Sequence, residues 1–217
     1  MAVNYALNYS HPCPWDLELP PLSMPDLLQQ AVAQAGDDPF IDFMGRRYSY
    51  SEIFDSARRF AAGLQARGIG KGERIGLFLP NVPIYPAAYY GAMMAGAVVV
   101  NFSPLYSVEE LEQQVADSGT RLLVTVDVPE LYATAEKVLR GSALRTLVVS
   151  SLAEMLPTFK GLAMRVLGRK KIARVSHDES VLAWREFLAR GREGKAALPE
   201  VDPHSLALLQ YTGGTTG

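Results

Sequence analysis

Short apolar runs alternate with amphipathic stretches through the middle of the chain. The apolar runs are rich in Val, Leu and Ile, a composition typical of strands buried on both faces; they are 73–80 (ERIGLFLP), 97–104 (AVVVNFSP), 121–126 (RLLVTV) and 144–151 (LRTLVVSS). The stretches 82–96, 107–119 and 129–141 have helical spacing and carry proline or a capping serine at the start. This alternation predicts an α/β fold, with a largely parallel sheet and helices on both of its faces.

The segment before this alternation predicts a different arrangement. A helix is expected over 24–36, followed by a hairpin over 39–50 that turns at Gly45, and then a second helix over 51–68. Ser51 stands at the start of the second helix and Gly68 at its end, and its apolar face comprises Ile53, Ala57, Phe60, Ala61 and Leu64. The proline-rich residues 1–21 predict an extended N-terminal arm, which leaves 22–217 as one domain portion.

The alternation breaks after Ser151. Residues 157–174 contain no acid and six cations, namely Lys160, Arg165, Arg169, Lys170, Lys171 and Arg174. A short helix is expected over 180–191. The chain then returns to a strand, and the apolar residues Leu208, Leu209 and Tyr211 predict that this last strand is buried.

Composition and charge narrow the class of protein. Hydrophobic residues make up 48% and charged residues 20% of the 217, which is typical of a folded globular chain. The net charge of -2 gives no reason to expect nucleic acid as a partner. The single cysteine, Cys13, suits a reducing compartment. The most apolar stretch, 87–100, is shorter than the roughly 20 residues of a membrane-spanning helix, so we expect a cytoplasmic protein.

The last strand leads into a loop made of glycine and threonine, "TGGTTG". Glycines let successive backbone N–H groups point at one anion, and threonine hydroxyls can donate to phosphate or complete a magnesium shell. The candidate phosphate-binding residues are Thr212, Gly213, Gly214, Thr215, Thr216 and Gly217. A plain flexible turn is the alternative, and on pattern alone a kinase-type or GTPase-type nucleotide loop could also begin at Gly213.

Three motifs in order give this chain a resemblance to a known superfamily. "LLQYTGGTTG" resembles the signature loop of the acyl-adenylate-forming enzymes; "YSYSEIFDSARRFAAGL" (48–64) and "GAMMAGAVVVNFSPLYSVEELEQQVADSG" (91–119) are similar to segments found upstream of it. Ile53 replaces the leucine usual in the first of these. The details look most like bacterial long-chain fatty acid–CoA ligases. Because three motifs in the same order are more specific than one, we favour this superfamily over the kinase interpretation.

The resemblance implies a two-step reaction and a set of ligands. ATP would activate a fatty acid as acyl-AMP, and coenzyme A would then accept the acyl group. Residues 212–217 would hold the β- and γ-phosphates, Thr212 would help hold Mg²⁺, and Tyr211 would serve packing. The superfamily's loop continues to a lysine and a helix. The resemblance therefore implies the opening, N-terminal portion of a longer enzyme, with no catalytic residue among these 217 and no activity alone.

Other features each have two interpretations. The apolar residues of 157–174 lie on one helical face, which fits peripheral contact with the inner face of the cell membrane, although a solvated surface helix is favoured. Tyr85, Tyr89, Tyr90, Met93 and Met94 form a stripe that favours core packing over an acyl tunnel. The alternatives for function are a ligase for medium-chain or aryl acids, and a non-catalytic module for dimerisation or lipid contact. The oligomeric state is left open, a homodimer included.

Overall fold

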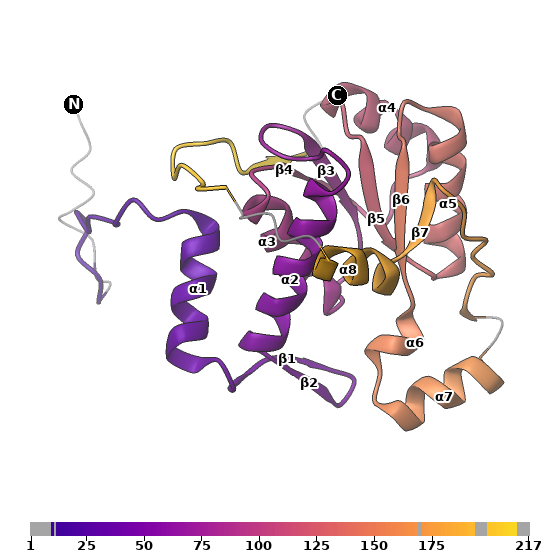
Figure 1. Cartoon of the computed structure of the whole chain (residues 1–217), viewed down its shortest axis with the longest axis horizontal. Coiled ribbons are helices and arrows are strands. Elements are labelled where there is room, and N and C mark those ends of the chain that lie inside the picture. The colour runs from indigo at the N-terminus through magenta and orange to yellow at the C-terminus, as the bar shows by residue number, and fades with distance from the viewer. Residues whose placement is uncertain (1–9, 11, 169–170, 194–198, 212–217) are drawn as a thin grey trace.

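A parallel six-stranded sheet forms the centre of the molecule, as seen in the computed structural model of the chain (Figure 1). The structure describes residues 10, 12–168, 171–193 and 199–211. The strands are β3 (Arg74–Phe78), β4 (Val98–Phe102), β5 (Leu122–Val126), β6 (Thr146–Ser150), β7 (Val181–Ala183) and β8 (Leu208–Gln210). They lie in the order β7-β6-β5-β3-β4-β8, and every neighbouring pair is parallel.

Helices cover both faces of this sheet, which confirms the predicted fold class. α2 (Tyr50–Gln65) packs on α3 (Ile84–Met94) and on α8 (Trp184–Glu193) along one face. α4 (Val108–Ser118) and α5 (Pro129–Gly141) pack together on the other, as Figure 1 shows. The N-terminal part adds α1 (Met24–Ala35) and an antiparallel hairpin of β1 (Pro39–Phe43) and β2 (Arg46–Ser49), as predicted.

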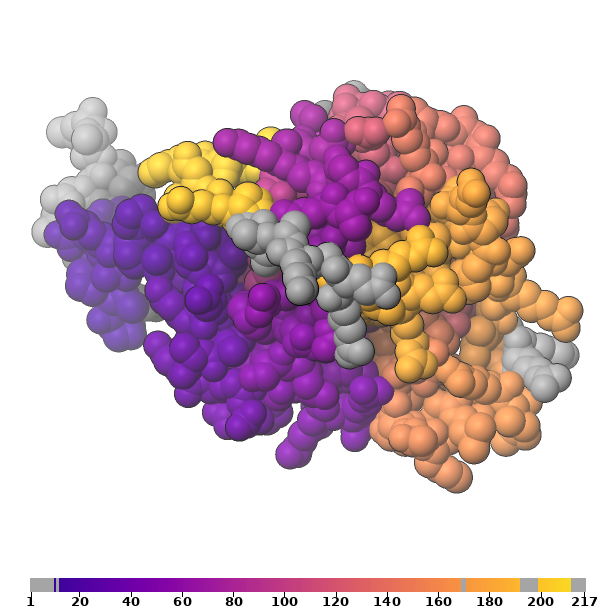
Figure 2. Space-filling view, in the orientation of Figure 1, coloured from indigo at the N-terminus to yellow at the C-terminus, as the bar shows by residue number. Residues whose placement is uncertain are grey.

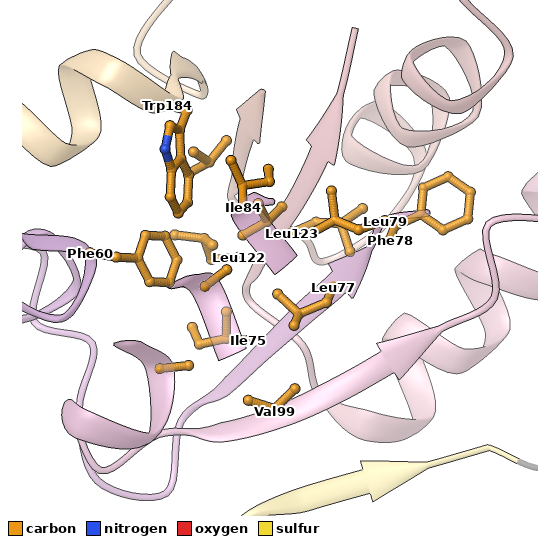
Figure 3. Packing of buried hydrophobic residues seen from close by; sticks show 14 of the residues in the cluster. Phe60, Ile75, Leu77, Phe78, Leu79, Ile84, Val99, Leu122, Leu123 and Trp184 are labelled. Carbon is orange, nitrogen blue, oxygen red and sulfur yellow. The ribbon is translucent and has the colours of Figure 1, made fainter. Parts of the chain in front are cut away.

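The core fills both faces of the sheet, with Leu111 and Val115 of α4 and Ala135 and Val138 of α5 buried on one face and the α2–α3–α8 layer on the other. Phe60 of α2 stacks on Trp184 with ring centroids 5.0 Å apart and tilts against Phe187 at 5.2 Å. Figure 3 shows these rings facing the aliphatic side chains of the strands, Ile75 and Leu122 among them. All five residues predicted for the buried face of α2 are buried. The hydrophobic periodicity of that helix therefore reported its packing correctly.

The start of α2 differs from the prediction. The N-cap is Ser49, not Ser51: the Ser49 hydroxyl accepts from the backbone N–H of Glu52, and the Glu52 carboxylate accepts from the backbone N–H of Ser49. This reciprocal pair is a capping box, which satisfies two backbone donors that a helix start otherwise leaves open. α1 and α4 begin in the same way, at Ser23 and Ser107.

The region after Ser151 departs most from the prediction. Residues 180–191 are not one helix, because 181–183 pair with β6 as the edge strand β7 before α8 begins. Two short helices also appear here, α6 (Leu152–Met155) and α7 (Thr158–Leu167). α7 ends before the cationic end of the predicted basic helix, and residues 169–170 lie outside the described residues.

The last strand is also less buried than predicted. β8 pairs only with β4 within the described part of the chain, and Leu208 and Leu209 are half-buried. An edge strand has a sheet neighbour on one side only, so its apolar residues keep part of their surface exposed. Among the described residues no helix is both long enough and apolar enough to cross a lipid bilayer.

Candidate functional site

A chain of polar side chains joins α3, β4 and β8 where the two strands end. The Tyr85 hydroxyl lies 2.8 Å from Asn101 Oδ1, and Asn101 Nδ2 donates to Gln210 Oε1 at 3.0 Å. Gln210 Nε2 donates in turn to the carbonyl oxygen of Tyr211 at 3.2 Å. Because Asn101 faces both neighbours at once, it ties the position of β8 to the start of α3. Burial raises the pKa of Tyr85, so its hydroxyl stays protonated and able to donate at neutral pH.

Tyr211 fixes the direction in which the chain leaves β8. Its ring stacks on Phe102 with centroids 6.2 Å apart, and its hydroxyl donates to Asp117 Oδ2 at 2.6 Å. Burial and this contact with a carboxylate raise the pKa of Tyr211 to about 12. The side chain therefore packs against β4 and anchors to the end of α4, a position in which the ring serves packing.

The predicted phosphate-binding residues follow directly after this anchor. Thr212, Gly213, Gly214, Thr215, Thr216 and Gly217 lie outside the described residues. The described chain leads up to them at the carboxyl end of β8, beside the carboxyl end of β4. Ligands of open parallel sheets bind at this kind of edge. The sequence did not reveal the supporting network, because Tyr85, Asn101 and Gln210 come together only through the pairing of β4 with β8.

The order of strands in the sheet indicates a second position at which a ligand could bind. From β3 the chain proceeds to β4, toward one edge of the sheet, whereas from β5 it proceeds to β6, toward the other edge. The strand order therefore reverses between β3 and β5. There the Thr125 hydroxyl donates to the carbonyl oxygen of Phe78 at 3.0 Å. Asp127 is buried close by, where burial raises the pKa of its carboxyl group, and it accepts from the backbone N–H of Leu152 at 2.7 Å. These groups satisfy each other and hold α6 in place.

A cavity of about 620 Å³ lies between α2, the starts of α3 and α8, and the α6–α7 segment. Its apolar wall includes Ile53, Ile84 and Trp184. At its polar side Arg165 and Arg185 approach the carboxylate of Glu154, at 2.9 Å and 3.4 Å. Across the whole lining the three cations Arg46, Arg165 and Arg185 are matched by the three acids Glu52, Asp55 and Glu154, so the cavity carries no net charge that would favour an ion. Sequence reasoning missed it, since its walls come from four distant segments.

The described residues give magnesium no site of their own. Within them, no group of three or more His, Cys, Asp or Glu side chains is arranged to hold a metal ion. The predicted magnesium-binding residue, Thr212, lies outside the described residues, as stated for its loop.

The stripe of tyrosines and methionines on α3 belongs to the packing of the fold. Met93 and Met94 are buried in the core, and the three tyrosines are half-buried against it. Tyr89 lies 6.1 Å from Tyr85 and 5.5 Å from Tyr90, measured between ring centroids. None of these three tyrosines lines the 620 Å³ cavity. Their burial favours the core-packing interpretation; of the five, Met93 borders a smaller cavity of about 170 Å³.

Known proteins match over almost the whole chain. The sequence model of one family, described as "AMP-binding enzyme", matches residues 28–217. A curated relative named long-chain-fatty-acid–CoA ligase, from Escherichia coli O6:H1, is 36% identical over 198 residues, covering 90% of this chain and 35% of the relative. A relative of the same name from Bacillus subtilis is 31% identical over 213 residues, covering 97% of this chain and 38% of the relative.

A solved structure shares the fold. The crystal structure of a long-chain-fatty-acid–CoA ligase from Archaeoglobus fulgidus matches with a TM-score of 0.67 and 24% identity, over 93% of this chain and 36% of that one. At this identity the match speaks for the fold alone. The chain thus spans about a third of the length of the relatives that it resembles.

Proposed function

Because the chain belongs to the family of AMP-binding enzymes, we propose that it is the N-terminal part of a ligase that joins a long-chain fatty acid to coenzyme A with ATP. The observation that carries this proposal is the 36% identity, over 90% of the chain, to a curated long-chain-fatty-acid–CoA ligase. Residues 22–217 would form the opening part of the adenylation domain, and residues 1–21 an arm that precedes it.

The proposed reaction has two steps. In the first, a carboxylate oxygen of the fatty acid attacks the α-phosphorus of ATP; the new O–P bond gives acyl-AMP as pyrophosphate leaves. In the second, the sulfur of coenzyme A attacks the acyl carbonyl carbon, the thiol proton is lost and AMP departs. Negative charge gathers on the triphosphate in the first transition state, so positioned N–H groups and hydroxyls would stabilise it.

The β4–β8 edge supports a role in holding that triphosphate. Asn101 and Tyr211 fix the end of β8 through the hydrogen bonds described above, so the following residues begin from a defined place. Residues 212–217 are proposed to wrap the β- and γ-phosphates, and the Thr212 hydroxyl to help hold Mg²⁺. When bound, the magnesium ion would neutralise charge on the phosphates. The residues of this chain supply positioning, and none is proposed as a general acid or base.

Pyrophosphate release tests the proposal. A protein extended to the length of the relatives should release pyrophosphate when given ATP, magnesium and a long-chain fatty acid, and release should stop when the divalent cation is chelated. The 217-residue chain alone should release none and should bind ATP weakly in calorimetry. Release with aryl acids only would favour the alternative substrate class. Absence of release with every carboxylic acid tested would refute the ligase function.

A further inference from the structure

α7 turns its apolar residues outward instead of toward the core. Its large apolar side chains are largely exposed: Phe159 by 82%, Leu162 by 63%, Val166 by 57% and Leu167 by 86%. A surface helix of a globular protein normally buries such a stripe. Exposed apolar residues that stand singly are ordinary, but four on one short helix form a patch of the kind that marks an interaction site.

The outward orientation is fixed by contacts on the opposite side of α7. Gly161 is buried, and a Cβ there would overlap the carbonyl oxygen of Ala153 in α6. Lys160 Nζ donates to the carbonyl oxygen of Met44 at 2.7 Å, and Arg165 pairs with Glu154 at 2.9 Å. α6 itself is tied to the hairpin, where the Tyr48 hydroxyl donates to the carbonyl oxygen of Met155 at 2.7 Å. α7 is therefore held by its glycine face, and its apolar face is left outside.

The two cations of α7 flank the apolar arc. At about 3.6 residues per turn, positions 159, 162, 166 and 167 share one side of the helix, roughly opposite Gly161. On the same wheel, Lys160 lies at one border of this arc and Arg165 at the other, and both residues are exposed. Residues 157–174 contain no Asp or Glu. Arg165 is paired with Glu154 of α6, but across the hairpin, α6 and α7 the four cations Arg46, Arg47, Lys160 and Arg165 outnumber the two acids Asp42 and Glu154. An apolar stripe on a surface of net positive charge is complementary to a bilayer whose headgroups carry negative charge.

The hairpin tip continues this surface. Met44 is 56% exposed and is joined to α7 by the hydrogen bond from Lys160. Figures 1 and 2 show the hairpin and α7 along the lower edge of the view. One end of the described structure therefore presents both apolar residues and cations.

We propose that α7, together with Met44, rests on an anionic phospholipid surface. The apolar arc would enter the boundary between headgroups and acyl chains, while Lys160, whose contact in the structure is a neutral carbonyl oxygen, reaches the phosphates at its border. The contact is peripheral and reversible, because α7 is far shorter than a spanning helix. This interaction surface goes beyond the proposed ligase function and does not depend on it, since vesicle binding is measured without ATP, coenzyme A or turnover.

Co-sedimentation with vesicles tests the surface directly. The chain is mixed with vesicles of phosphatidylcholine, with and without phosphatidylglycerol, at low and high salt. The test variant is Phe159→Ser/Leu167→Ser. The matched control, Leu17→Ser/Leu19→Ser, removes two leucines of the arm that are 53% and 79% exposed. All four side chains are largely exposed, so neither variant should unfold the chain; circular dichroism checks this.

We expect the chain to bind the anionic vesicles and to dissociate at high salt, because salt screens the cations. The α7 variant should bind at least about tenfold more weakly, and the arm variant should bind as the original does. Equal binding by the two variants, or binding that ignores lipid charge, overturns the proposal. The same assay on a protein extended to the relatives' length must agree: loss of binding there would mean that other residues of the protein cover α7.

Discussion

Asn101 is the residue on which the β4–β8 edge depends most. It connects Tyr85 in α3 with Gln210 in β8, and no other side chain among the described residues joins these two elements by hydrogen bonds. Its replacement leaves the half-buried Tyr85 hydroxyl and the exposed Gln210 side chain without their partner. The hydrogen bonds of one side chain thus tie the end of β8, which precedes the proposed phosphate-binding residues, to α3.

The substitution Asn101→Ala should lower the free energy of unfolding by about 1–2 kcal/mol, because it removes two hydrogen bonds that are each worth about 0.5–1.5 kcal/mol net. Denaturant titration measures this change. Asn81→Ala is the matched control: Asn81 is exposed, and its side chain has no hydrogen-bond partner within the described part of the chain. Equal effects of the two substitutions would show that the polar chain does not support β8.

Tyr211 makes the stability of the folded chain depend on pH in the alkaline range. Its folded-state pKa of about 12 exceeds the value near 10 of an unfolded tyrosine. The folded state therefore keeps a proton that the unfolded state releases, and stability from this group is complete below about pH 10 and falls as the pH rises toward 12. We expect the absorbance titration of phenolate to lose its last-titrating tyrosine in Tyr211→Phe. An unchanged titration would show that Tyr211 is not the anchored residue.

At the scale of elements, two serines near the start of α2 have different roles in capping the helix. Ser49 forms the capping box with Glu52, whereas the Ser51 hydroxyl makes no hydrogen bond among the described residues. Ser49→Ala should lower the free energy of unfolding by about 1 kcal/mol. Ser51→Ala should change it by a few tenths at most, since it removes no cap. The reverse order of these two effects would restore the start of the helix to the position that the sequence first suggested.

The contact between α2 and α3 depends on a glycine. A Cβ at Gly91 would lie 2.5 Å from the carbonyl oxygen of Ala57 and 3.0 Å from a ring carbon of Phe60. Alanine favours a helix over glycine by nearly 1 kcal/mol, yet we expect Gly91→Ala to destabilise the protein by about 1–3 kcal/mol, because the helices must move apart. A Cβ at Gly70 would meet only the Ala95 carbonyl oxygen, at an ordinary contact distance of 3.6 Å, so the control substitution Gly70→Ala should be nearly neutral.

The sequence predicted the regular elements well where one physical signal dominated. Continuous runs such as 121–126 gave β5, and the periodic residues of α2 gave its buried face. It failed where tertiary pairing decided the outcome. Val181–Ala183 became a strand because β6 offered an open edge, although its residues also fit a helix. For α7 the spacing of apolar residues predicted a helix but not its orientation, which the contact of Gly161 with α6 determines.

At the scale of the whole molecule, the candidate site was predictable only as a motif. The glycine–threonine loop and the two upstream segments indicated the family, and the comparisons support that family over residues 28–217. The network of Tyr85, Asn101 and Gln210 was not predictable, because these residues are far apart in sequence and meet through the order of strands in the sheet. The Thr212–Gly217 assignment stays a prediction.

The central claim is that this chain opens an enzyme that activates long-chain fatty acids through acyl-AMP. The most direct test is pyrophosphate release by the protein extended to the relatives' length, with ATP and magnesium, in the presence and absence of a long-chain fatty acid. We predict release that requires the fatty acid and that is greater than with an aryl acid. Release that is the same with and without any carboxylic acid, or none at all from the folded protein, would contradict the account.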